Sequence, residues 1–159
     1  MNRLAMTIAA MGIALTAGQA AASNACTTPA NVNQMATAIA EGLNANRRAN
    51  GQSPIRYNPQ LSQAAMGHAC DMSVNGFFGH NGSNGSNIMH RVKATGYCPR
   101  LAAENLAWGY PDPQQIVTGW MNSAGHRSNM LHGRVTEFGI GISNGARGPN
   151  WVLVVARSC

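Results

Sequence analysis

The first half of the chain carries apolar residues at helical spacing. Between residues 31 and 50 they recur at steps of three and four, the pattern of an amphipathic helix, at Val32, Met35, Ile39 and Leu43. Gly51 marks the end of this helix. A second helix is expected from Asn58-Pro59 to Gly76, because asparagine is a good N-cap and proline fits the first turn. His68 falls on its apolar face and is interpreted as a structural histidine.

The middle of the chain predicts shorter elements separated by turn-forming residues. Glycine, asparagine and serine dominate one stretch, which indicates a loop inside a single domain. In chain order we expect that polar loop over 79–87, a short helix over 88–95, a strand over 103–108, a helix from Asp112-Pro113 to about Asn122, and a tight turn with a short helix over 123–131.

The end of the chain changes to the period of β-structure. Residues 135–143 and 151–157 are rich in β-branched and aromatic residues and flank a turn at 144–149, which predicts a hairpin. The run from Val152 to Val155 is apolar on both faces, as in a strand covered on both sides. Helices first and a hairpin last predict an α+β domain, an α-β-α sandwich with a central antiparallel sheet.

The N-terminal apolar run does not belong to this domain. Arg3 precedes an apolar stretch over 4–18, and Ala20-Ala21-Ala22 follows it, which is the layout of a signal peptide. The stretch is too short to span a bilayer as a stable helix. We therefore expect a signal peptide over 1–22 and one domain over 23–159. The mature protein is expected to be secreted or periplasmic, monomeric and without a transmembrane segment.

The chain has four cysteines, Cys26, Cys70, Cys98 and Cys159. An even number in an exported protein predicts two disulfides, and four cysteines allow three pairings. We prefer Cys26–Cys159, which ties the two ends together, with Cys70–Cys98 inside the domain. The cysteines are too dispersed for a structural zinc knot.

The formal net charge is +6, and the basic residues are scattered apart from the adjacent Arg47-Arg48. No basic stripe with interleaved aromatic residues occurs, so nucleic acid is not an expected partner. A modest positive charge favours binding to anionic surfaces such as lipid headgroups or cell-wall polymers. The alternative is that the charge only keeps the protein soluble.

Three residues stand out as candidate chemistry, His80, Glu104 and His126. Charged residues make up only 10% of the chain, so a carboxylate in a patterned segment is unusual. Two imidazoles and a carboxylate have two uses. His80 and His126 can hold a divalent metal such as Zn²⁺. Alternatively, Glu104 orients one histidine while the other exchanges a proton near neutral pH.

Four short motifs surround these residues in fixed order, Phe77-Phe78-Gly79-His80, Ala103-Glu104-Asn105-Leu106-Ala107, the stretch from Trp120 to Leu131, and Thr136-Glu137-Phe138-Gly139-Ile140-Gly141. With them the chain resembles the CAP superfamily (cysteine-rich secretory protein, antigen 5, pathogenesis-related 1; the SCP domain) over about 31–157. It is similar in particular to the compact bacterial members. The resemblance implies an α-β-α sandwich and a surface cleft lined by two histidines and two acidic residues.

The resemblance places the first cleft histidine on His80, one acid on Glu104 and the second histidine on His126. The second acid is a departure, because Ser123 stands where animal members have an acidic residue after the tryptophan. Glu137 is the nearby carboxylate that can substitute for it. Ser123 is interpreted as a helix cap, with a nucleophile beside His126 as the minority alternative.

The family has no general shared reaction, and its members have been linked to sterol or lipid binding, signalling, defence and, in some cases, proteolysis. We expect an exported binding or interaction module whose His/Glu cleft takes a divalent metal, with an extracellular or envelope ligand as partner and no other cofactor. Two alternatives stay open. One is a metal-dependent or acid–base hydrolase, peptidase-like, with Glu104 as base. The other is sterol or lipid carriage in an apolar groove between helices.

Overall fold

A computed structural model describes residues 25–159, so the predicted signal peptide lies outside the described residues. The described chain folds into five helices and four strands. The helices are α1 (Val32–Ala49), α2 (Pro59–Asn75), α3 (Ile88–Ala94), α4 (Pro113–Asn122) and α5 (Ala124–Met130), and the strands are β1 (Arg56–Tyr57), β2 (Pro99–Trp108), β3 (Glu137–Gly145) and β4 (Gly148–Ser158). Within this part of the chain, none of the helices combines the length and the hydropathy needed to cross a membrane.

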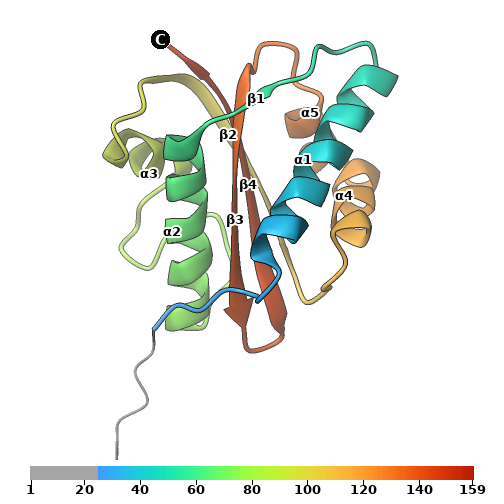
Figure 1. Cartoon of the computed structure of the whole chain (residues 1–159). Helices are drawn as coiled ribbons and strands as arrows, with labels where there is room; N and C mark the ends of the chain where they lie inside the picture. The colour runs from blue at the N-terminus through green and yellow to red at the C-terminus, as the bar shows by residue number, and fades with distance from the viewer. Residues whose placement is uncertain (1–24) are drawn as a thin grey trace, which may run out of the picture.

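The sheet has the strand order β1-β3-β4-β2 and lies between two layers of helices. Helices α2 and α3 cover one face, and α1, α4 and α5 cover the other (Figure 1). Strands β2, β4 and β3 are antiparallel, and the two-residue β1 pairs parallel with β3. The predicted α-β-α sandwich is therefore confirmed, with one short parallel pair at the edge of an otherwise antiparallel sheet.

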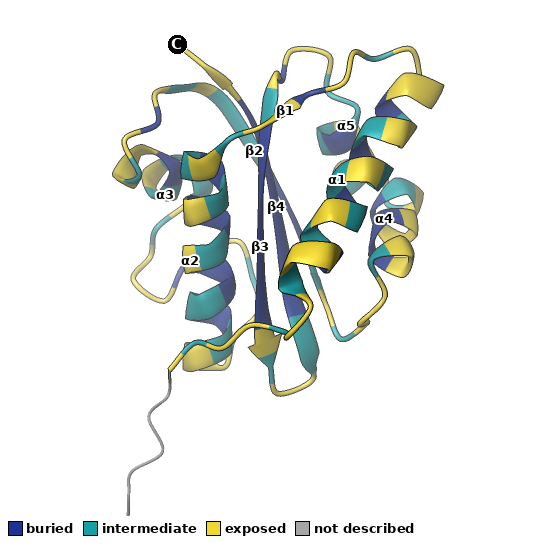
Figure 2. Cartoon of the chain, viewed as in Figure 1, coloured by how far each residue is buried: buried dark blue, intermediate teal, exposed yellow. Residues whose placement is uncertain are grey.

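The two long helices begin and end where local signals place them. On α2, the Asn58 side chain accepts hydrogen bonds from the backbone N–H groups of Gln60 and Leu61, at 2.9 and 3.2 Å. Gly76 closes the same helix in the left-handed conformation, with φ +67°. Both helices turn their predicted apolar stripes toward the sheet, and Figure 2 shows this as buried inner and exposed outer faces.

Strand β4 lies in the middle of the sheet and contributes to two separate cores. Trp151, Leu153 and Val155 pack with α1, α4 and α5. Val152, Val154 and Ala156 pack with α2 and α3. The run that is apolar on both faces is therefore a central strand covered on both sides, as predicted.

Two predicted boundaries differ from the structure, and one strand was not predicted. The hairpin turn is reduced to Ala146-Arg147, because β3 and β4 stay paired as far as Gly145 and Gly148. Strand β2 begins at Pro99 rather than 103, since its first residues pair with the end of β4. Strand β1 was missed, because two exposed residues carry no pattern of their own.

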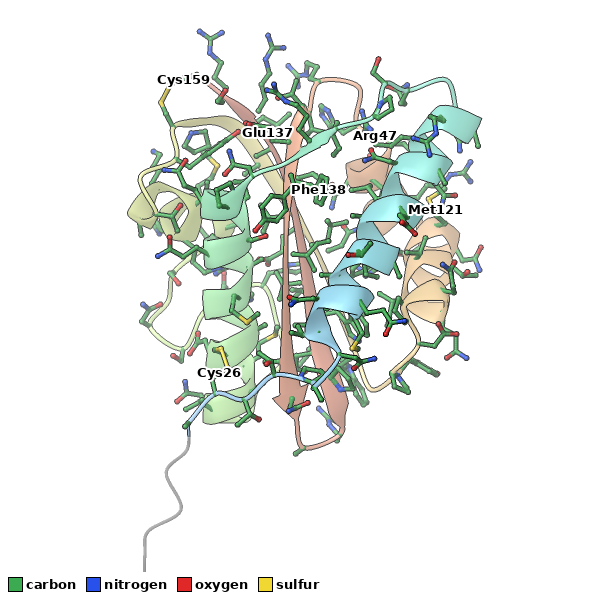
Figure 3. All side chains as sticks on the ribbon, viewed as in Figure 1. Cys26, Arg47, Met121, Glu137, Phe138 and Cys159 are labelled. Carbon is green, nitrogen blue, oxygen red and sulfur yellow. A yellow bond between two sulfur atoms is a disulfide. The ribbon has the colours of Figure 1, made fainter. Side chains whose placement is uncertain are left out.

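The preferred disulfide pairing is wrong. The structure joins Cys26 to Cys70 and Cys98 to Cys159, with Cα–Cα distances of 5.2 and 5.5 Å. The antiparallel register of β2 and β4 brings the C-terminal residue next to Cys98. Cys26 lies at the foot of α2, at the opposite end of the domain from Cys159 (Figure 3). The two ends of the described chain are therefore too far apart for the predicted bond.

Candidate functional site

Glu104 is the central residue of the predicted site, and each of its carboxylate oxygens accepts a hydrogen bond. Its side chain on β2 is only 2% exposed. One oxygen accepts a hydrogen bond from Nδ1 of His80 at 2.9 Å, and the other accepts from the guanidinium of Arg91 at 2.8 Å. Arg91 comes from α3 and is itself nearly buried. Glu104 thus joins the loop that carries His80 to α3 and to the sheet.

His68 supports this arrangement from α2. Its Nε2 donates to the carbonyl of Gly79 at 2.9 Å and lies 3.8 Å from a carboxylate oxygen of Glu104. Burial lowers the pKa of His68, and the nearby Glu104 carboxylate only partly counters this effect. The neutral imidazole holds the residue that precedes His80, which agrees with its interpretation as a structural histidine.

His126 approaches the cleft from the other helical layer, on α5. Its backbone carbonyl accepts a hydrogen bond from the Asn105 side chain at 3.0 Å, and Asn129 donates to Oδ1 of Asn105 at 2.9 Å. These bonds attach α5 to β2, the edge strand of the sheet. Burial, and secondly the charge of His80, lower the pKa of His126. His80 and His126 are thus close enough for the charge of one to affect the pKa of the other.

The indole of Trp120 and the side-chain amide of Asn129 donate hydrogen bonds to backbone carbonyls on the unpaired side of β2. Trp120 donates from Nε1 to the Leu106 carbonyl at 3.0 Å, and Asn129 donates to the Glu104 carbonyl at 3.3 Å. Carbonyls on an edge strand otherwise need water or another chain as partner. The motif from Trp120 to Leu131 therefore positions α5 against β2 and also covers part of the edge of the sheet.

The two weaker candidates do not complete a tetrad. Glu137 accepts hydrogen bonds from the Tyr97 hydroxyl at 2.6 Å and from the Asn58 side chain at 3.2 Å, so it braces the junction of β1 and α2. Ser123 occupies the N-cap position of α5, but its side chain makes no capping hydrogen bond. Among the described residues its hydroxyl makes no hydrogen bond to the imidazole of His126.

A groove of about 690 Å³ begins at His126 and Ser123. We call it the aromatic groove, because its walls include Phe78, Trp108, Tyr110 and Trp120. Trp108 ends the strand expected over 103–108, and Tyr110 and Arg147 were not singled out from the sequence. Tyr110 follows the end of β2 and Arg147 lies in the turn between β3 and β4, so neither belongs to a periodic segment of the sequence.

The donor set at the cleft consists of two imidazoles. Because Nδ1 of His80 is committed to Glu104, Nε2 is the ring nitrogen that remains free to bind a ligand. Between residues 25 and 159, no group of three or more histidine, cysteine or acidic side chains is arranged to hold a metal ion. Of the two histidines, only His80 has its ring orientation fixed by Glu104.

Comparisons with known proteins agree with this geometry. The chain matches the Cysteine-rich secretory protein family, CAP, over residues 40–156. It is 32% identical over 113 residues to the uncharacterised protein YkwD of Bacillus subtilis (strain 168), covering 71% of this chain and 44% of that protein. It is also 30% identical over 104 residues to the uncharacterised membrane protein YlbC of that strain, covering 65% of this chain and 30% of YlbC. The chain thus spans less than half the length of these curated relatives.

Solved structures show the same fold. An extracellular protein containing an SCP domain from Bacillus anthracis aligns with a TM-score of 0.73 and 26% identity, covering 79% of this chain and 41% of that one. An outer surface protein of Borrelia burgdorferi aligns with a TM-score of 0.75 and 17% identity, covering 84% and 99%. With its sandwich, its His80–Glu104 pair and its α5 histidine, this chain belongs to the CAP family of cysteine-rich secretory proteins.

Proposed function

We propose that this protein is an exported binding module whose ligand contacts the imidazoles of His80 and His126. The proposal rests on the hydrogen bonds and the burial of the Glu104 side chain. Both of its oxygens are occupied, by His80 and by Arg91, and its side chain is buried. A general base must lie within hydrogen-bond reach of the proton that it removes, and a side chain that is 2% exposed presents little of its carboxylate to a substrate. Glu104 is better suited to orienting His80 than to removing a proton.

Two observations support export. Both disulfides are of the kind that persists in oxidising compartments. The SCP-domain relative from Bacillus anthracis is described as an extracellular protein. We therefore place the function outside the cytoplasm, in the secreted fluid or the cell envelope, with an extracellular or envelope ligand.

A divalent metal fits this site as a weakly held partner. Zinc sites in proteins usually take three or four protein ligands, and this cleft offers two imidazole nitrogens. The Glu104–His80 hydrogen bond is the outer contact that fixes the ring orientation of a metal-binding histidine. Bound Zn²⁺ would supply a positive centre for an anionic or carbonyl group of the ligand. His80 and His126 would hold it, and Glu104 would keep His80 in position.

We expect Zn²⁺ to bind the protein with one-to-one stoichiometry, and replacement of His80 or His126 by alanine to weaken binding by about tenfold or more, since each removes one of two ligands. Isothermal titration calorimetry of the disulfide-bonded protein measures this. The matched control is His90→Ala, because His90 is an exposed histidine on α3, outside the cleft.

Equal Zn²⁺ affinity in all three variants would rule out a metal at this cleft. Hydrolysis of a peptide or ester panel that requires Zn²⁺ and disappears in the His80→Ala/His126→Ala double variant would instead establish the hydrolase alternative. That result would also require a base other than Glu104.

A second candidate function, lipid or sterol carriage, is favoured by a separate apolar groove. It has a volume of about 700 Å³ and lies between α1 and α2, beside β3. Its walls include Ala36, Met66, Phe138 and Ile140. This volume falls within the usual range for small-molecule sites, and the apolar walls fit an acyl chain or a sterol ring system.

If this groove carries lipid, Thr37→Trp should reduce binding of a fluorescent fatty acid or sterol by about tenfold, because the indole would fill the groove from the exposed side of α1. Gln34→Trp places the same side chain on an exposed position of α1 outside the groove wall and should bind normally. The lipid function fails if delipidated wild-type protein takes up neither probe.

A further inference from the structure

The aromatic groove contains a positively charged group that the cleft does not use. Arg147, from the turn between β3 and β4, places its guanidinium carbon 4.1 Å from the ring centre of Trp108. Phe78 meets the same indole edge-on, with ring centres 6.2 Å apart. The guanidinium is therefore held over an aromatic face, which is a favourable cation–π position.

Close backbone contacts hold the turn between β3 and β4 against the end of β2. Gly148 has φ +99°, and a β-carbon there would lie 2.6 Å from the carbonyl oxygen of Gly109. Gly109 itself donates to the Pro149 carbonyl at 3.1 Å. On the other side, Trp151 donates from its indole to the Tyr110 carbonyl at 3.0 Å. These contacts set the positions of Arg147 and Tyr110 relative to Trp108.

The charge of Arg147 is unmatched within the described chain. Among residues 25–159 no carboxylate forms an ion pair with it, and the walls of the aromatic groove contain no aspartate or glutamate. A guanidinium has only donors, and its planar fork matches a carboxylate. Arg147 is exposed, and its contact with Trp108 favours one orientation of the side chain, so less conformational freedom is lost when an anion binds.

The walls of the groove favour a ring as the apolar part of the ligand. Trp108 is 39% exposed, Phe78 39% and Tyr110 62%, so three of the five large apolar side chains that are exposed in the described chain gather here. Aromatic side chains pack well against other rings in offset or edge-to-face arrangements. The groove volume of about 690 Å³ fits a small ligand rather than a folded partner.

We propose that the aromatic groove binds a ring-bearing carboxylate, whose carboxylate pairs with Arg147 and whose ring packs against Trp108 and Tyr110. Aromatic acids and uronic sugars share this chemistry. The inference rests on the proposed function in one respect, because His126, which belongs to the proposed His80–Glu104–His126 site, also lines the groove. It does not require a metal. The groove between α1 and α2 is a poorer place for such a ligand, since its wall includes Glu41 and no arginine or lysine.

Calorimetry on the disulfide-bonded protein in EDTA tests the inference, with indole-3-acetate as the aromatic acid and glucuronate as the sugar acid. At least one of the two acids should bind. Its neutral analogue, indole-3-acetamide or methyl glucuronate, should have an affinity lower by about tenfold or more. Arg147→Gln should weaken the acid about tenfold while leaving the amide or ester unchanged. The control is Arg48→Gln, which changes an exposed arginine on α1.

The two acids distinguish the source of the ligand, because a flat aromatic ring and a saturated sugar ring make different contacts with the same walls. Decanoate, which has a carboxylate but no ring, tests whether a ring is needed. If decanoate binds as tightly as the better of the two ring-bearing acids, the proposed preference for a ring is wrong. Equal affinity of acid and neutral analogue, or no effect of Arg147→Gln, would overturn the role of Arg147. If neither acid binds but Zn²⁺ still requires His80 and His126, the inference fails and the proposed function stands.

Discussion

Gly139→Ala is expected to destabilise the domain by about 3 kcal/mol or more, or to prevent folding. A β-carbon at this position on β3 would overlap the backbone of α2 at Leu61 and Ser62. Gly141 faces α2 in the same way, at Ala65 and Met66. Neither backbone can yield easily, because β3 is paired with β4 and α2 is hydrogen-bonded internally. The helix would have to move away from the sheet and separate one of the two cores.

Urea unfolding followed by circular dichroism measures this effect, with protein yield as a second readout. Gly67→Ala is the matched control, because Gly67 is on α2 but exposed, and a β-carbon added there would have no atom within 4 Å. It should stabilise the domain by up to about 1 kcal/mol through helix propensity. If Gly139→Ala unfolds within about 1 kcal/mol of wild type, the close approach of β3 and α2 is incorrect.

Glu104→Ala is expected to cost about 3–5 kcal/mol of folding free energy, as for the removal of one partner from a buried ion pair. Arg91 is only 10% exposed in its side chain and would keep its charge without the carboxylate that lies 2.8 Å away. His80 would lose its hydrogen bond as well, so the loop before α3 would lose its attachment to β2.

The free energy of unfolding of Glu104→Ala, Arg91→Met and the double variant gives the coupling between the two residues. The double variant should recover part of the loss, because it leaves no unpaired buried charge. Glu41→Ala is the control, since Glu41 is an exposed carboxylate on α1. A loss below about 1 kcal/mol in Glu104→Ala would show that the cluster does not hold the site together.

Most element positions could be predicted, because they depend on neighbours in the sequence. Asn58-Pro59 and Asp112-Pro113 both proved to be helix starts with side-chain caps. The apolar stripe of α1 and the doubly apolar β4 were also correct. These signals act over one or two turns of chain, so they need no knowledge of the fold.

Other residues took roles that their local sequence does not reveal. Arg47 belongs to a pair of adjacent arginines, yet its side chain is buried and donates to the carbonyls of Ser53, Met130 and His132. Burial lowers its pKa, and these carbonyls compensate for the lost water. The same holds for the Cys98–Cys159 disulfide, whose pairing follows from the register of β2 and β4 rather than from spacing along the chain.

For the candidate site, too, the sequence reveals some features and only the fold reveals the others. Its motifs, and with them the family, could be recognised from the order of residues around His80, Glu104 and His126. Whether these residues act as base, orienting group or ligand depends on their contacts across the sheet. Only the fold pairs Glu104 with Arg91, places Glu137 beside Tyr97, and brings Arg147 over Trp108. Local free energies select helices and strands, whereas hydrogen bonds and charge pairs between distant segments form only once packing has set their distances.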